Sequence, residues 1–365
     1  MKSQTREIRL TLPGRDQSYR VLISHGLRFS LGRELAALNL PKRLFLVSDR
    51  RVAALYGGQL ERALKEAGYH PTLLAIPPGE RTKRWTVVQR LAKELLAGGA
   101  HRQTPLIALG GGVVGDLTGF LASIFMRGVP FVQVPTTLLA MVDASIGGKT
   151  AINLPEGKNL LGTFYQPRLV LTDPEFLHTL PSRERLNGLA EILKHGFIRD
   201  PDLLARLEAG RPRLFQNPEE LTDIIYRAAA IKAEVVAADE READRRRILN
   251  FGHTLGHALE AATGFRLPHG QAVAWGMLAA LELSTRLTGL PPQAAVYGQR
   301  LLREFGLACR PPAVTPEAVL AALPLDKKRE EQGLVLVLLE DLGKPVIYPH
   351  VPLGLAADWL RSVRG

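Results

Sequence analysis

Residues 105–116 read PLIALGGGVVGD, so a short apolar run leads directly into clustered glycines and an acidic side chain. The apolar run predicts a buried strand, and the glycines predict a tight turn into a helix. In α/β proteins such a turn cradles a pyrophosphate, because glycine lets the backbone approach and the helix N-terminus supplies N–H donors. The spacing is not a strict G-x-G-x-x-G, so a turn required only for packing is the alternative interpretation.

The flanking sequence indicates an α/β domain around this turn. Apolar runs at 44–47 and 73–76 predict two more buried strands, and helical segments separate them. Alternating strands and helices favour a largely parallel sheet. Alternation of apolar and polar residues over 8–23, around a Pro-Gly turn, predicts an amino-terminal β-hairpin. Asp49 follows the first of these runs, where dinucleotide-binding domains place an acidic residue for a ribose hydroxyl.

The pattern changes after Pro181, where long amphipathic segments rich in Ala, Leu, Glu and Arg begin. These segments cover 184–198, 221–238, 254–262 and 271–287. Pro181 interrupts the preceding pattern and Ser182 can cap a helix. Strand-like runs become rare, apart from 334–339. The sequence therefore predicts an α/β domain over 1–181 and a mostly helical domain over 182–365.

The bulk composition is that of a globular enzyme, with 46% hydrophobic and 23% charged residues. The single cysteine, Cys309, rules out an intrachain disulfide and fits a reducing cytoplasm. No apolar stretch approaches the ~20 residues that cross a bilayer, and the first residues lack a signal-peptide pattern. We therefore expect a cytoplasmic protein without membrane contact.

The formal net charge is +11, which is compatible with a nucleic-acid binder. The basic residues are spread along the chain, however, and the tight runs, Arg245–Arg247 and Lys327–Arg329, hold only three residues each. An Arg-rich genome and attraction of anionic, phosphorylated ligands both explain the excess, and the charge alone does not separate them. We expect no specific nucleic-acid binding.

A second Gly-Lys element covers 147–150 and reads GGKT. A Walker A loop would also need glycine at position 143, which is Asp143 here, so the pattern argues against a P-loop ATPase. Lys149 remains a candidate anion-binding residue, as do Lys158 and Asn159 in the Gly-Lys-Asn that follows.

Histidines and a glutamate in the second half form a candidate metal site. His253 and His257 lie at i and i+4, which would place both on one helix face. His269 precedes another expected helix, and Glu191 and Lys194 lie one turn apart on an earlier helix. Imidazole nitrogens with one carboxylate and an open position make a catalytic zinc-type site.

Spacing alone indicates His253 and His257 as joint ligands. The alternatives are that both rings simply pack beside glycines, and that His195 is a ligand in place of one of them. A helix beginning at or before Arg246 would add Arg246 and Asn250 to the same face, whereas a loop through 250–252 would break that alignment.

Several sequence blocks together resemble the 3-dehydroquinate synthase family. They are PTTLLA at 135–140, VDASIGGKT at 142–150, GKNL at 157–160, LAEILK at 189–194, NFGHTLGH at 250–257, HG at 269–270 and DKK at 326–328. The blocks occur in the family's order and span nearly the whole chain, so their combination is far more specific than any one of them.

The resemblance implies an N-terminal, Rossmann-like NAD-binding α/β domain and a C-terminal helical metal-binding domain, with the active site between them, in a homodimer. It implies Glu191, His253 and His269 as the ligands of a divalent metal, zinc or cobalt. His257 then corresponds to a catalytic histidine that is not a ligand, which overrules the expectation from spacing.

The resemblance also implies roles for individual positions. NAD contacts are expected from Asp49, Glu80, Lys83, Gly111, Gly112, Val113, Asp116, Thr136, Thr137, Asp143, Lys149, Lys158 and Thr179. Substrate contacts are expected from Arg127, Asp143, Lys149, Lys158, Asn159, Glu191, Lys194, Lys232, Arg246, Asn250, His257, His269 and either Lys327 or Lys328. Direct participation in catalysis is expected from His257, Lys149, Asn159, Lys194, Lys232, Arg246 and Asn250. Arg127 is expected to reach the phosphate site of a neighbouring subunit. Arg51 departs from the small polar residue frequent in the family near the NAD ribose, so contacts there stay open.

The implied reaction converts 3-deoxy-D-arabino-heptulosonate 7-phosphate into 3-dehydroquinate and phosphate with transient use of NAD. Two other functions remain as rivals. One is another sugar-phosphate cyclase, against which Arg246, Asn250 and His257 argue. The other is a metal-dependent polyol or alcohol dehydrogenase, which would need fewer phosphate-binding cations than this chain offers.

Overall fold

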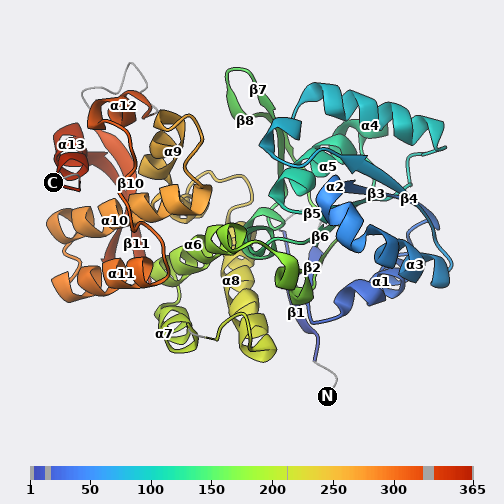
Figure 1. The fold of residues 1–365 in the computed structure, drawn as a ribbon, viewed down its shortest axis with the longest axis horizontal. Helices are drawn as coiled ribbons and strands as arrows, with labels where there is room; N and C mark the ends of the chain where they lie inside the picture. Colours follow the sequence, from blue (N-terminus) through green and yellow to red (C-terminus); the bar gives the residue numbers. More distant parts are fainter. Residues whose placement is uncertain (1–3, 13–17, 212, 324–332, 364–365) are drawn as a thin grey trace. The chain divides into compact units, whose positions relative to one another are not determined.

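The computed structural model describes residues 4–12, 18–211, 213–323 and 333–363. The chain forms two compact units (Figure 1). The first contains residues 1–180 and 215–241, and the second contains residues 181–214 and 242–365. The sequence pattern predicted a boundary at 181/182 and assigned all later residues to the second domain. The first unit in fact also includes 215–241, because the helix in this segment packs on it.

The first unit is built on a seven-stranded sheet with the order β1-β2-β9-β6-β5-β3-β4. The strands are β1 (Arg6–Leu10), β2 (Tyr19–Ile23), β3 (Arg43–Asp49), β4 (His70–Ile76), β5 (Leu106–Gly110), β6 (Phe131–Pro135) and β9 (Leu169–Thr172). Only the β1–β2 pair is antiparallel, and every other neighbouring pair is parallel. The expected hairpin and the expected parallel sheet are therefore both present.

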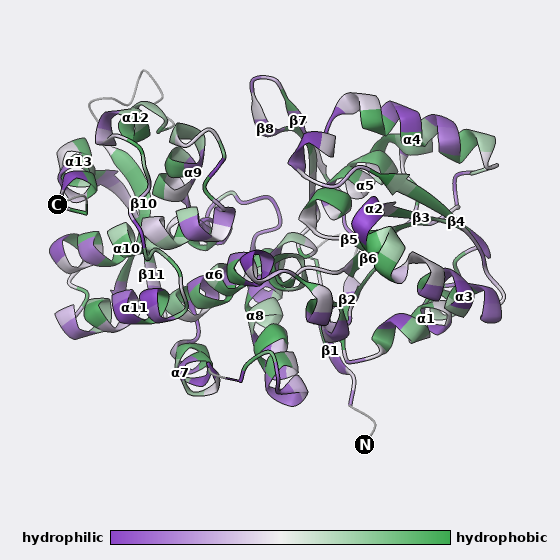
Figure 2. Cartoon of the chain, in the orientation of Figure 1, coloured by the Kyte–Doolittle hydropathy of each residue, from purple (hydrophilic) through white to green (hydrophobic). Residues whose placement is uncertain are grey.

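Helices cover this sheet. The longer ones are α1 (Leu31–Ala37), α3 (Gly58–Glu66), α4 (Trp85–Ala97), α5 (Gly112–Ile124) and α8 (Pro218–Ala238), and the short ones are η1 (Leu27–Ser30), α2 (Arg50–Val52), η2 (Ala53–Gly57), η3 (Glu80–Thr82), η4 (Phe125–Arg127), η5 (Ala140–Ala144) and η6 (Pro174–Thr179). Strands β5, β6 and β9 are buried throughout, as parallel strands with covered faces are. Helix α5 is hydrophobic along most of its length (Figure 2), because it lies over this core.

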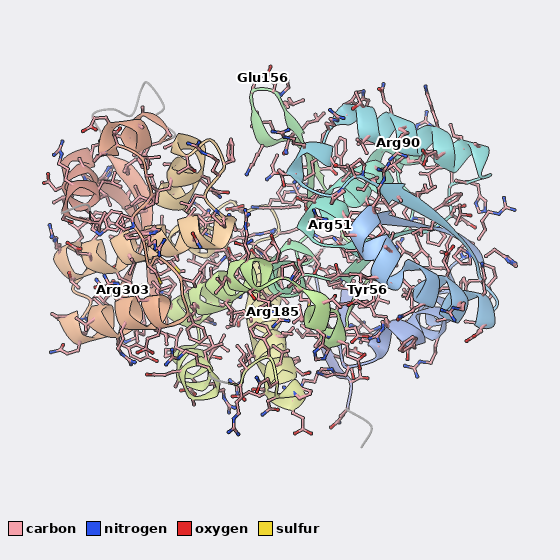
Figure 3. The ribbon with its side chains drawn as sticks, viewed as in Figure 1. Arg51, Tyr56, Arg90, Glu156, Arg185 and Arg303 are labelled. Atoms are coloured by element: carbon pink, nitrogen blue, oxygen red, sulfur yellow. The ribbon has the colours of Figure 1, made fainter. Side chains whose placement is uncertain are left out.

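A separate two-stranded hairpin, β7 (Lys149–Leu154) and β8 (Gly157–Phe164), extends from the first unit and packs on α5. Glu156 lies at its tip (Figure 3). The sequence analysis did not predict this hairpin, although it singled out Lys149, Lys158 and Asn159 within it.

The second unit is mostly helical, as expected. Its elements are α6 (Ser182–Ile198), α7 (Pro201–Gly210), η7 (Arg245–Asn250), α9 (His253–Ala262), α10 (His269–Leu287), α11 (Pro292–Glu304), α12 (Pro316–Ala321), β10 (Leu334–Asp341), β11 (Lys344–Val351) and α13 (Leu353–Ser362). Strand β10 confirms the strand predicted at 334–339, and it pairs antiparallel with β11. No described helix is both long and apolar enough to cross a membrane.

Helices α9 and α10 approach each other so closely that only glycine fits at the contact. A Cβ atom built on Gly276 would lie 1.8 Å from the carbonyl oxygen of Gly252, which itself has a φ of 77°. One built on Gly256 would lie 3.1 Å from the carbonyl oxygen of Ala272. This contact sets the position of the first turn of α9 relative to α10.

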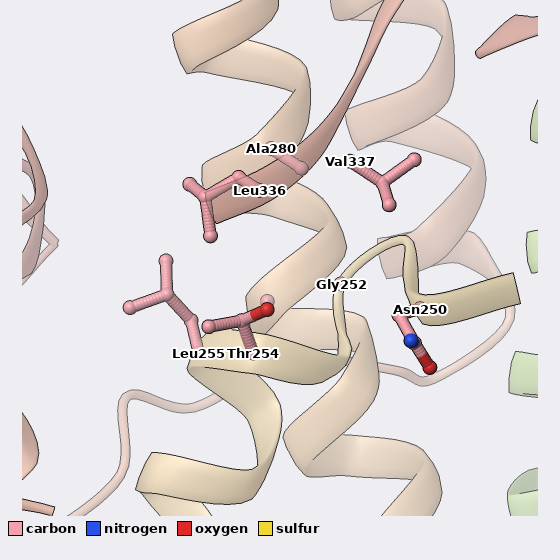
Figure 4. Close-up of a pocket in the computed structure, with 8 residues that line it drawn as sticks. Asn250, Gly252, Thr254, Leu255, Ala280, Leu336 and Val337 are labelled. Carbon is pink, nitrogen blue, oxygen red and sulfur yellow. The ribbon is translucent and has the colours of Figure 1, made fainter. Parts of the chain in front are cut away.

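A small pocket lies beside the same contact (Figure 4). It is lined by Asn250, Gly252, Thr254, Leu255, Gly276, Ala280, Leu336 and Val337. Asn250 lies at one end, and Leu255 and Leu336 lie at the other. None of the lining side chains is charged.

Replacement of Gly276 by alanine tests the helix contact. Glycine to alanine inside a helix normally stabilises by up to about 1 kcal/mol. Here the new methyl group would push the α9 turn away, and overpacking of this kind typically destabilises by about 1–3 kcal/mol or more. We expect G276A to unfold at lower denaturant concentration than the unchanged protein. G354A is the matched control in α13, where a built Cβ meets nothing within 4 Å. Equal stability of the two variants would contradict the tight contact.

Candidate metal centre and nucleotide cradle

Three residues that are distant in sequence meet in the second unit. The Nε2 atoms of His253 and His269 lie 3.4 Å and 3.1 Å from the same oxygen, Oε1 of Glu191. One potential ligand atom from each of the three residues lies within 4.8 Å of the others. Two imidazoles and one carboxylate with this convergence fit a catalytic zinc-type ion that keeps an open coordination position.

Local structure explains the convergence. His253 is the first residue of α9 and His269 is the first residue of α10, and the glycine contact holds these two helix starts together. The start of α10 is tied to α6, since the backbone N–H of Gly270 donates to Oδ1 of Asn187 at 2.9 Å. Glu191 lies one helical turn beyond Asn187 and is completely buried.

The far side of each histidine ring also has a partner. Nδ1 of His253 lies 3.2 Å from the carbonyl oxygen of Phe251, and Nδ1 of His269 lies 3.3 Å from Oε2 of Glu260. Carbonyl and carboxylate oxygens accept hydrogen bonds, so both contacts favour a proton on Nδ1 and leave Nε2 for Glu191 or a metal. The sequence analysis did not single out Glu260.

The centre is electrostatically strong. Lys194 is buried one turn after Glu191 and forms an ion pair with its other oxygen, Oε2. Burial raises the pKa of Glu191, but Lys194 and His253 outweigh it and hold that pKa well below its usual value. Burial likewise lowers the pKa of His269, but hydrogen bonds to Glu191 and Glu260 prevail and raise it to about 10. The carboxylates of Glu191 and Glu260 thus create a negative potential at His269, which would also favour binding of a divalent cation.

His257 lies at the edge of the centre rather than inside it. Its ring centroid is 5.3 Å from that of His253, and its side chain is 61% exposed. Among the described residues, no group of three potential ligand atoms contains both His253 and His257. The arrangement therefore gives no support to the expectation from spacing that these two are joint ligands. His195 is buried and belongs to none of these groups.

Arg246 and Asn250 lie in η7, not on the helix of the histidines. Gly252, with its left-handed backbone, separates η7 from α9, so the single helix face suggested by the spacing does not form. Arg246 is almost completely buried. The Asn250 amide donates to Oε1 of Glu242 at 2.8 Å. Lys327 and Lys328 lie outside the described residues.

The predicted strand–glycine–helix turn is present in the first unit, between β5 and α5. A Cβ atom on Gly111 would lie 2.8 Å from Cγ2 of Thr137, and one on Gly115 would lie 2.6 Å from Oε1 of Gln133. Thr136 and Thr137 follow the adjacent strand β6, so they lie beside the turn. Gly112 and Val113 form the first turn of α5, with Gly111 as its N-cap. The glycines thus allow the turn to pack closely against Thr137 and Gln133.

A polar network joins this turn to the β7–β8 hairpin. The buried Lys83 ammonium donates to Oδ2 of Asp116 at 2.6 Å and also to Oδ1 of Asn159. Asn153 donates to Oε1 of Glu80 at 2.7 Å and accepts from the backbone N–H of Asn159 at 2.9 Å. The network unites four of the residues expected around NAD or substrate. Asn153, which holds two of them, was missed by the sequence analysis.

The other expected residues of the first unit are distributed over several loops. Asp143 in η5 forms an ion pair with Lys232 of α8, and α8 also packs on η5 and β1. Lys149 and Arg127 are exposed, and Lys158 is half-buried. The Thr179 hydroxyl lies 2.6 Å from the hydroxyl of Tyr56.

Asp49 caps α2 by accepting hydrogen bonds from the backbone N–H groups of Arg51 and Val52 at 2.9 Å and 3.2 Å. Arg51 itself is exposed next to this cap (Figure 3). The carboxylate of Asp49 therefore has a structural partner at the end of β3, where the sequence predicted a ribose-binding acid.

Comparison with known proteins bears on what this arrangement does. Residues 73–187 match the family model described as 3-dehydroquinate synthase N-terminal, and residues 188–329 match the model described as 3-dehydroquinate synthase C-terminal. A 3-dehydroquinate synthase of Nostoc punctiforme is 44% identical over 362 residues, which is 98% of each chain. The chain belongs to the 3-dehydroquinate synthase family. The synthase of Nitrosomonas europaea is also 44% identical, over 96% of this chain and 95% of its own.

Solved structures confirm the predicted fold class of this family member. A 2-epi-5-epi-valiolone synthase from Streptomyces hygroscopicus, solved with NAD+ and Zn2+, is 31% identical and superposes with a TM-score of 0.87 over 97% of this chain and 99% of its own. A 2-deoxy-scyllo-inosose synthase complexed with carbaglucose-6-phosphate, NAD+ and Co2+ is 27% identical with a TM-score of 0.87. An iron-containing alcohol dehydrogenase, 16% identical with a TM-score of 0.69, shares the fold alone.

Proposed function

We propose that this protein is a cytoplasmic 3-dehydroquinate synthase of the shikimate pathway, acting on 3-deoxy-D-arabino-heptulosonate 7-phosphate. The reaction would oxidise the C5 hydroxyl, eliminate phosphate, reduce C5 again and close the ring by an intramolecular aldol addition, without net change of NAD. The observation that carries the proposal is the convergence of Glu191, His253 and His269 in a chain that matches the family over both domains.

Zinc or cobalt is the proposed metal, held by Glu191, His253 and His269. Bound there, it supplies a Lewis acid that lowers the pKa of an alcohol, while NAD+ supplies a hydride acceptor. Lys194 keeps Glu191 ionised, since the two are buried as a pair. His257 lies beside His253, with ring centroids 5.3 Å apart, and its side chain is 61% exposed, so it can reach a bound substrate and transfer a proton.

Binding of NAD+ is assigned to the first domain. The start of α5 after Gly111 offers backbone N–H groups to a pyrophosphate, and Asp49, Thr136 and Thr137 lie at the ends of neighbouring strands. Ligands of open parallel sheets bind outside the carboxyl ends of the strands, which supports this placement. Glu80, Lys83, Asp116, Asp143, Lys149, Lys158 and Thr179 complete the proposed set.

The substrate is an anion with a carboxylate and a phosphate, so its binding is assigned mainly to cations and amides. These are Arg127, Lys149, Lys158, Asn159, Lys194, Lys232, Arg246, Asn250 and Lys327, together with His257. Charge-assisted hydrogen bonds in a dry site hold such groups firmly and orient the reacting carbon atoms. Arg246 is the most deeply buried arginine of this set, and it suits a carboxylate through its planar fork.

A direct assay tests the function. Purified protein with NAD+ and Zn2+ or Co2+ should release inorganic phosphate from 3-deoxy-D-arabino-heptulosonate 7-phosphate with no steady rise in absorbance from NADH. The product should be 3-dehydroquinate by mass and by conversion with a dehydratase. Steady accumulation of NADH would point to a dehydrogenase, and turnover of only sedoheptulose or glucose phosphates would point to another cyclase.

Two histidine substitutions separate ligand from catalyst. H269A should lose bound metal, because it removes one of three ligands, whereas H257A should retain about one metal per chain and still lose most turnover. A positioned proton-transfer group contributes roughly 10²–10⁴-fold to rate, so we expect a fall in kcat of that order for H257A. The measurements are metal content after dialysis and the phosphate-release rate. Loss of metal from H257A would make it a ligand instead.

We also propose a homodimer in which Arg127 serves the partner's site. Arg127 is exposed at the end of η4, and Met126, Arg127 and Gly128 have consecutive positive φ values of 49°, 69° and 117°. Such a backbone is strained for two non-glycine residues, and strain of this kind persists where the surroundings impose it and often marks functional sites.

Mixed dimers test this assignment. R127A and K194A should each be nearly inactive alone. If Arg127 acts in the partner's site, a heterodimer of one R127A and one K194A chain has one intact site and should regain about half of the activity of the unchanged dimer. Co-expression with two different affinity tags isolates that heterodimer. Absence of any recovery would place Arg127 in the site of its own chain.

A further inference from the structure

Glu260 lies next to the centre but outside the proposed ligand set. It belongs to α9, and its side chain is only 9% exposed. Oε2 lies 3.3 Å from Nδ1 of His269 and 4.0 Å from Nε2 of His257. It is therefore a buried carboxylate directed at the side of His269 that faces away from Glu191.

We propose that Glu260 is a positioning residue that fixes the ring orientation and the tautomer of His269. The inference rests on the proposed metal centre. An ionised carboxylate only accepts, so the contact holds a proton on Nδ1 of His269 and turns Nε2 toward Glu191, whose Oε1 lies 3.1 Å away. Nε2 is then the ring atom that a metal would bind in place of a proton.

His253 provides an internal comparison. Its Nδ1 faces the backbone carbonyl oxygen of Phe251, two residues earlier, at 3.2 Å. That acceptor is part of the chain and survives any side-chain substitution. His269 begins α10 and depends on a side chain of another helix for the same purpose. Substitution of Glu260 should therefore disturb one ligand of the centre and leave the other oriented.

The backbone of Glu260 is itself held firmly. Its carbonyl oxygen accepts hydrogen bonds from the Thr263 hydroxyl at 2.9 Å and from the backbone N–H of Phe265 at 2.7 Å, at the end of α9. These bonds fix the backbone from which the Glu260 side chain extends toward His269. Partners of this kind raise the basicity of a histidine ligand, and their removal typically weakens metal binding by about 10–100-fold.

Two nearly isosteric variants test the proposal. E260M keeps the volume but removes the acceptor, and E260Q keeps an acceptor oxygen without the charge. We expect Co2+ to bind E260M about 10–100-fold more weakly than the unchanged protein, with an altered visible d–d spectrum, and E260Q to lose less than about tenfold. The measurement is Co2+ titration of the metal-free protein against a chromophoric chelator. E282M, which breaks the exposed pair with Arg286 on α10, is the control and should bind as the unchanged protein does.

The outcomes separate the two proposals. If the unchanged protein binds no Co2+, the metal centre of the proposed function fails. If it binds Co2+ and E260M binds within about twofold of it, or E260M and E260Q weaken binding equally, the role of Glu260 is overturned. Should E260M not fold, E260L takes its place, because it also removes the acceptor at similar volume. Binding of Co2+ by E260L within about twofold of the unchanged protein would overturn the proposal.

Discussion

The structure of the second unit depends on one buried carboxylate. Glu191 is completely inaccessible, and an ionised carboxylate without partners is very unfavourable in that position. Lys194, His253 and His269 supply the partners, and all of them approach its two oxygens. Helices α6, α9 and α10 thus pack around an ionised carboxylate whose charge their own side chains balance, and the same residues form a candidate cation site. Glu191, Lys194, His253 and His269 are therefore structural residues of the second unit as well as candidate functional residues.

The glycine contact between α9 and α10 is the second constraint, and it serves the first. Two helix starts must bring their first side chains to one carboxylate, and this is possible only if the backbones nearly touch at Gly252 and Gly276. A Cβ atom built on Gly276 would lie 1.8 Å from the Gly252 carbonyl oxygen, so a methyl group there would force the two backbones apart. Gly252 and Gly276 thus influence the metal centre indirectly, because the backbone contact between them helps to position His253 and His269.

Much of the fold could be predicted from the sequence, because its signals are local. The apolar runs at 44–47 and 106–109 became buried strands, and the glycines after the latter became the turn into α5. The run at 73–76 was predicted to be buried but ends the edge strand β4, where only Leu74 and Ile76 are buried. The position of α8 could not be predicted, since an amphipathic pattern shows that a helix has a buried face but not what covers it. Helix α8 packs on η5 and β1 of the first unit, and its ion pair between Lys232 and Asp143 joins residues 89 positions apart in sequence.

The site shows the same limit. Spacing correctly brings the rings of His253 and His257 near each other, with centroids 5.3 Å apart, yet it cannot reveal that Glu191 lies beside only one of them. Family resemblance supplied that choice. Glu260 could have been noticed, because it lies three residues after His257 and so on the same helix face, but its contact with His269 crosses between helices and has no periodic signal.

The fold alone does not distinguish a cyclase from a dehydrogenase, since an alcohol dehydrogenase shares it at 16% identity. The buried charged side chains of the second unit are a better guide to which of the two reactions this protein catalyses. Lys194 balances the charge of Glu191 whatever the substrate is, so it does not separate the two reactions. We propose that Arg246, buried in the same unit, does separate them, because a substrate that carries phosphate and carboxylate calls for a buried cation and a neutral polyol does not.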